Sequence, residues 1–78
     1  MDTVADILRL AAGTLADSSE SPELDAEVLL STVMGVVRSA LIVRAEEPVD
    51  AELLRAYRRL IDRRMNGVPV AYLTGRRE

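Results

Sequence analysis

The sequence predicts an all-α fold, a small bundle of about five helices with no sheet. Apolar residues recur three and four positions apart along most of the chain, which is the pattern of helices that each bury one face. Gly, Pro and polar residues interrupt this pattern at intervals, and no segment shows the sustained alternation of a strand. With 78 residues, the chain has room for one domain at most.

The first helix is predicted from Thr3 to about Ala16. Thr3 is a typical capping residue, and Asp6 follows it at the spacing of a capping box. The apolar stripe of this helix comprises Val4, Ile7, Leu8, Ala11, Ala12 and Leu15. A polar segment from Asp17 to Glu20 then ends it.

The second helix is predicted to begin with Ser21 as its cap and Pro22 in its first turn, where a missing N–H costs nothing. It is expected to run to Met34 and end at Gly35. Its apolar residues occupy two faces, one with Leu24 and Val28, the other with Ala26, Leu29, Leu30 and Val33. This pattern predicts that the second helix lies at the centre of the bundle.

Three further helices are expected in the second half of the chain. Ser39 is a candidate cap for a short helix through about Ala45, which carries Leu41, Ile42 and Val43. Asp50 is predicted to cap the longest helix, which reaches about Met65 and stops at Asn66-Gly67. Its apolar arc consists of Leu53, Leu54, Tyr57, Leu60, Ile61 and Met65. A last short turn after Val68-Pro69 closes at Gly75.

Composition excludes several classes of chemistry. The chain has no Cys and no His, so disulfides and Cys- or His-based zinc, haem and iron–sulfur sites are excluded. Catalysis by Ser-His or Cys-His pairs is excluded for the same reason. The net charge of −3 argues against a dedicated nucleic-acid-binding domain. No apolar run reaches the roughly 18 residues of a membrane span, and the N-terminus, Met1-Asp2-Thr3, does not read as a charged-then-apolar leader, so a cytoplasmic location is expected.

Arginines on the predicted fourth helix form the first candidate site. Arg55, Arg59 and Arg63 share its outer face, where they are candidates for a surface that docks an acidic or nucleic-acid partner. The alternative is an ordinary solvated face, on which Glu52 and Asp62 form weak ion pairs with these arginines.

Arg64 differs because the helical wheel places it within the apolar arc, where a charge requires a partner. A structural ion pair is therefore predicted, with Asp25 as the favoured partner and Glu27 as the second choice. These two carboxylates lie two positions apart on one helix and point in nearly opposite directions, so joint acid–base catalysis is not expected. Tyr57 and Tyr72 are expected to pack their rings and keep their hydroxyls in water.

Two sequence blocks resemble a known family. The first is Ser19-Glu20-Ser21-Pro22-Glu23-Leu24-Asp25-Ala26-Glu27-Val28-Leu29-Leu30, followed by Gly35. The second is Arg63-Arg64-Met65-Asn66-Gly67-Val68-Pro69-Val70-Ala71-Tyr72-Leu73-Thr74-Gly75-Arg76-Arg77-Glu78. Both are similar to the N-terminal domain of HemK/PrmC-type release-factor glutamine methyltransferases. Val68 departs from the pattern, since the family usually has Glu there, and no contact made by that carboxylate is carried over.

The resemblance implies a function for the parent protein. The family's full-length enzyme transfers a methyl group from S-adenosylmethionine to the Gln side-chain amide of the Gly-Gly-Gln loop in class I peptide-chain release factors. Its catalytic domain carries a Gly-rich cofactor loop and an Asn-Pro-Pro-Tyr motif, and neither occurs in these 78 residues. No catalytic, cofactor-binding or metal-binding residue is therefore expected here.

The resemblance also implies a division of the chain. Residues 1–75 would form a helical substrate-recruitment domain, and residues 76–78 would begin the linker to an absent methyltransferase domain. The expected partners are the release factor and the parent's own catalytic domain, without a membrane or direct nucleic-acid contact. Two alternatives remain open: a purely structural bundle that stabilises the catalytic domain, and a stand-alone protein-interaction module.

Overall fold

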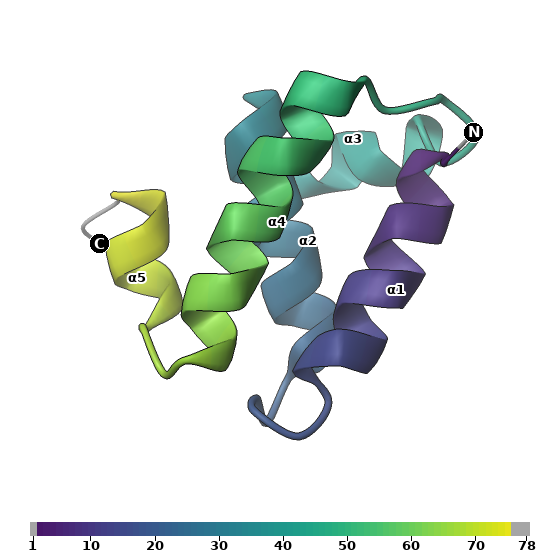
Figure 1. The fold of residues 1–78 in the computed structure, drawn as a ribbon. Helices are drawn as coiled ribbons and strands as arrows, with labels where there is room; N and C mark the ends of the chain where they lie inside the picture. Colours follow the sequence, from purple (N-terminus) through teal and green to yellow (C-terminus); the bar gives the residue numbers. More distant parts are fainter. Residues whose placement is uncertain (1, 76–78) are drawn as a thin grey trace.

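Five helices make up residues 2–75, the part of the chain that this computed structural model describes (Figure 1). They are α1 (Val4–Leu15), α2 (Pro22–Met34), α3 (Arg38–Val43), α4 (Ala51–Met65) and α5 (Val70–Thr74). No strand occurs among these residues, in which Thr3 and Pro48 form only an isolated antiparallel bridge. The predicted all-α bundle is confirmed. The predicted linker, residues 76–78, lies outside the described residues.

The start of α1 is held by the predicted capping box. The Thr3 hydroxyl accepts a hydrogen bond from the Asp6 N–H, and the Asp6 carboxylate accepts one from the Thr3 N–H, each at 3.2 Å. The hydrogen bond from the Thr3 backbone is the main reason that the pKa of Asp6 lies below its usual value of 3.8. Asp6 therefore stays ionised at neutral pH, and the box weakens only as the pH falls through this lowered pKa.

The start of α2 differs in detail from the prediction. Ser21 is the capping residue and Pro22 begins the helix, but the Ser21 side chain makes no capping hydrogen bond. Its backbone angles, φ −135° and ψ 66°, lie outside the extended conformation that aims a capping hydroxyl at the helix. The Ser19 hydroxyl instead accepts the Ser21 N–H at 3.0 Å. At the other end, Gly35 terminates α2 with a φ of 71°, as expected.

The predicted boundaries of α3 were wrong. The helix begins at Arg38 and ends at Val43, so Ser39 lies inside it. Val37 occupies the capping position because its backbone is extended, and its side chain has no group that could accept a hydrogen bond. Leu41 is the buried residue of α3, whereas Ile42 and Val43 are exposed.

Both ends of α4 follow the sequence signals. The Asp50 carboxylate accepts a hydrogen bond from the Leu53 N–H at 2.9 Å and caps the helix. The chain leaves the helix through Asn66 and then Gly67, which has a φ of 93°. The short α5 follows Pro69 and ends at Gly75.

The core surrounds α2, which packs against all four other helices, so its predicted central position is confirmed. Its second apolar face is only partly buried, however, because Leu24 is exposed. Figure 1 shows α1 and α5 on opposite sides of α4. The buried apolar residues come from all five helices and one loop: Val4, Ile7, Ala11, Leu15, Ala26, Leu29, Leu30, Leu41, Val49, Tyr57, Ile61 and Leu73. Within residues 2–75, no helix has the length and apolar composition to cross a membrane.

The two tyrosines differ from each other and from expectation. Tyr57 is only 1% exposed, and its hydroxyl donates a hydrogen bond to the Ala26 carbonyl oxygen at 2.9 Å. This bond joins α4 to α2, and burial raises the pKa of the phenol. The hydroxyl is therefore not in water, and that expectation was wrong. Tyr72 is exposed, because the short α5 turns Leu73 rather than Tyr72 into the core.

Candidate docking surface

The three arginines predicted to form a docking surface lie in one row along α4. Arg55, Arg59 and Arg63 are spaced four residues apart and all three are exposed. No ion pair among residues 2–75 joins them to Glu52 or Asp62. Their guanidinium groups therefore remain available to hydrogen-bond a carboxylate on another molecule.

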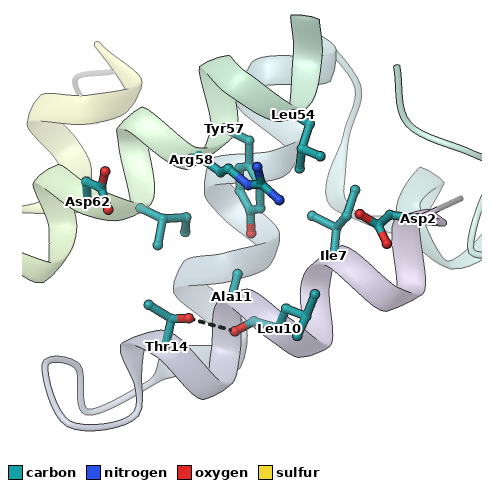
Figure 2. Close-up of a pocket in the computed structure, with 10 residues that line it drawn as sticks. Asp2, Ile7, Leu10, Ala11, Thr14, Leu54, Tyr57, Arg58 and Asp62 are labelled. Carbon is teal, nitrogen blue, oxygen red and sulfur yellow. Dashed lines mark hydrogen bonds between the residues drawn. The ribbon is translucent and has the colours of Figure 1, made fainter. Parts of the chain in front are cut away.

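An open groove of about 370 Å³ runs between α1 and α4 (Figure 2). Its walls are mainly apolar, with Ile7, Leu10 and Ala11 from α1 and Leu54, Tyr57 and Ile61 from α4. Arg58 lies over the α4 wall, next in sequence to Arg59 of the row. Figure 2 shows Asp2 and Asp62 toward opposite ends of the groove.

Arg64 forms an ion pair with Asp25. The Arg64 Nε lies 3.0 Å from the Asp25 Oδ2, and the two side chains are only 19% and 15% exposed. The Ser19 hydroxyl donates to the same oxygen at 2.6 Å. Three segments therefore meet at one carboxylate: the loop before α2, α2 itself and the end of α4.

Glu27, the second candidate partner, does not contact Arg64. Its carboxylate accepts hydrogen bonds from the Nε and the terminal nitrogen of Arg38, at 3.3 and 3.1 Å. This pair links α2 to α3 and is well exposed, so its contribution to stability is small. Asp25 and Glu27 thus face different helices, as their spacing predicted.

Comparison with known proteins assigns the family. A sequence model of the PrmC N-terminal domain matches residues 6–75. The chain belongs to the PrmC N-terminal domain family. It is 40% identical to a release factor glutamine methyltransferase from Shewanella oneidensis over 96% of this chain and 26% of that protein. It is 45% identical to a protein of the same name from Yersinia pestis over 91% of this chain and 25% of that protein.

A third relative, from Burkholderia pseudomallei, is also named release factor glutamine methyltransferase. It is 45% identical over 86% of this chain and 24% of its own length. This PrmC N-terminal domain therefore spans about a quarter of the length of the curated relatives it matches. The comparison with solved structures found no match to the chain.

Two parts of the PrmC N-terminal domain surface were missed by sequence reasoning. Leu10 is 64% exposed at the groove, and the signal was present, since Leu10 is an apolar residue outside the stripe of its own helix. Arg58 carried no such signal, because its position depends on how α4 crosses α1. Among the described residues, no cluster of acidic side chains could hold a metal ion.

Proposed function

We propose that this domain recruits a class I peptide-chain release factor to the methyltransferase part of its parent enzyme. The parent would then transfer a methyl group from S-adenosylmethionine to the Gln amide of the Gly-Gly-Gln loop, in the cytoplasm. Family membership and the names of the relatives support this proposal. One observation assigns the proposed recruitment to particular residues. Arg55, Arg59 and Arg63 form a row that is exposed and has no ion pairs within residues 2–75.

The proposed mechanism is the use of binding energy for orientation. Contacts between this domain and the release factor, remote from the reacting Gln, would hold the loop in the catalytic pocket of the parent. Such contacts reduce the entropy that must be lost before reaction, without any chemistry in the domain itself. The domain would also rest against the parent's own catalytic part.

Reversing the charge of the arginine row tests the proposal. In the full-length parent, the combined change Arg55→Glu, Arg59→Glu and Arg63→Glu should lower kcat/KM on an intact release factor by about tenfold or more, because like charges would then meet at the interface. A short peptide containing Gly-Gly-Gln should react within about twofold of the wild-type rate, because it cannot reach α4. Steady-state kinetics on both substrates provides the measurement.

The same comparison addresses the alternatives. Equal losses on protein and peptide would indicate that the bundle only supports the catalytic part, which is the purely structural alternative. Unchanged kinetics on the intact release factor would contradict the assigned docking surface. A stand-alone interaction module is tested separately, by reading the codons that follow Glu78 in the parent gene.

Cofactor binding provides a second prediction. Isothermal titration of the 78-residue chain with S-adenosylmethionine should show no binding, because the cofactor loop and the Asn-Pro-Pro-Tyr motif implied for the parent are absent from its sequence. The full-length parent, titrated under the same conditions, is the positive control. Micromolar affinity of the isolated chain would contradict the assignment.

A further inference from the structure

The groove between α1 and α4 offers little to a polar ligand. Two neutral polar side chains reach its walls, and both donate hydrogen bonds inside the domain. The Tyr57 hydroxyl donates to the Ala26 carbonyl. The Thr14 hydroxyl donates to the Leu10 carbonyl at 3.0 Å (Figure 2). A small polar molecule would therefore find few convergent groups in the interior of the groove, although its volume of about 370 Å³ is within the range of ligand sites.

An apolar side chain fits this groove better. Leu10 is 64% exposed at one wall, while Ile7, Ala11 and Ile61 form a buried floor behind it. An inserted side chain would cover Leu10 and contact the floor, so apolar surface would leave water on both molecules. Apolar anchors of this kind, seated in a pocket, contribute most of the affinity at many protein interfaces.

The charge beside the groove specifies what flanks that anchor. Arg58 lies on the α4 wall, and two carboxylates, Asp2 and Asp62, line the groove toward its opposite ends (Figure 2). Arg55, Arg59 and Arg63 lie farther around the same helix, outside the lining of the groove. None of the four arginines forms an ion pair within residues 2–75. A partner segment that places its apolar anchor in the groove and its carboxylates over the arginines of α4, away from Asp2 and Asp62, would match both features.

We propose that the groove between α1 and α4 receives an apolar side chain of the release factor, flanked by carboxylates that pair with the α4 arginines. This inference rests on the proposed function and adds the recognised chemistry, an apolar anchor between acidic residues. The groove and the arginine row then occupy neighbouring faces of α4, with the anchor fixing position and the arginines steering the encounter.

Two matched substitutions test the anchor. Leu10→Ser removes the exposed wall of the groove, and Ile42→Ser removes a comparably exposed apolar side chain on α3, away from the groove. In the full-length parent, Leu10→Ser should weaken binding of an intact release factor by about tenfold, as expected for loss of an anchor contact. Ile42→Ser should change binding by less than about twofold. Leu10→Met, which restores apolar surface, should bind like wild type.

The salt dependence of binding distinguishes the contribution of the apolar anchor from that of the arginines. Raising the salt concentration to about 0.5 M should reduce the deficit caused by the triple arginine reversal, because charges are screened over a few ångströms at such ionic strength. The deficit of the uncharged Leu10→Ser variant should persist. Isothermal titration at both salt concentrations, with circular dichroism of each variant to verify folding, provides the readout.

The outcomes distinguish a failure of the groove proposal from a failure of the proposed function. Wild-type binding by Leu10→Ser, together with a loss in the arginine variant, would overturn the groove and leave the proposed function in place. Wild-type binding by both variants would count against the docking surface as a whole. Equal losses in Leu10→Ser and Ile42→Ser would show a nonspecific effect and overturn the groove. A change in the enzyme's mass in solution on Leu10→Ser would assign the groove to self-association instead.

Discussion

Replacing Tyr57 with alanine is expected to remove a large part of the domain's stability. Tyr57 is the largest side chain that is fully buried, and it packs at the contact between α4 and α2. Truncation of a buried aromatic residue typically costs about 3–5 kcal/mol. The whole stability of a domain of this length is on the order of 4–12 kcal/mol. Chemical denaturation of the 78-residue chain, followed by circular dichroism, should show a large fall in the free energy of unfolding.

Tyr57→Phe is the matched control for this prediction. It keeps the ring and removes only the hydroxyl, so the Ala26 carbonyl loses one of its two hydrogen bonds. Ala26 lies inside α2, where its carbonyl retains the helical bond, and the expected loss is about 1 kcal/mol. A Phe variant as unstable as the Ala variant would show that the hydrogen bond, not the ring, joins the two helices. A loss below about 1 kcal/mol in Tyr57→Ala would contradict the assigned core.

The elements that the sequence predicts well are those with local causes. The capping box of α1 and the cap at Asp50 depend on partners three residues away, and Gly35 ends α2 by its own left-handed conformation. Ser21 and Ser39 show where this reasoning fails. Both are good capping residues by type. The backbone angles of Ser21, however, do not allow its hydroxyl to cap α2, and Ser39 lies inside α3 because that helix begins one residue earlier, at Arg38.

Contacts between distant segments were harder to predict. The acceptor of the Tyr57 hydroxyl is 31 residues away in sequence, and no pattern on α4 indicates it. The groove likewise requires the crossing of α1 and α4, so Arg58 could not be placed in it from a helical wheel. The arginine row was predictable because all its members share one helix.

The ion pair of Arg64 supplies the second large expected effect. Arg64→Ala would remove the arginine from a carboxylate that is only 15% exposed and would also remove the packing of the arginine stem. Loss of one partner from a shielded pair costs more than the pair contributes, because the remaining charge is left without compensation. We expect a loss of about 2 kcal/mol, below the roughly 3–5 kcal/mol of fully buried pairs, because both side chains are partly exposed and the Ser19 hydroxyl still donates to Asp25.

Arg59→Ala is the matched control on the same helix. Arg59 is exposed and has no ion pair within residues 2–75, so its removal should change the free energy of unfolding by less than about 0.5 kcal/mol. Chemical denaturation of both variants, measured side by side, gives the difference directly. If both losses were equal and small, the contact between Arg64 and Asp25 would contribute no net stability. Arg64 would then join the arginine row as a candidate contact of the release factor, since it lies in the last turn of the same helix.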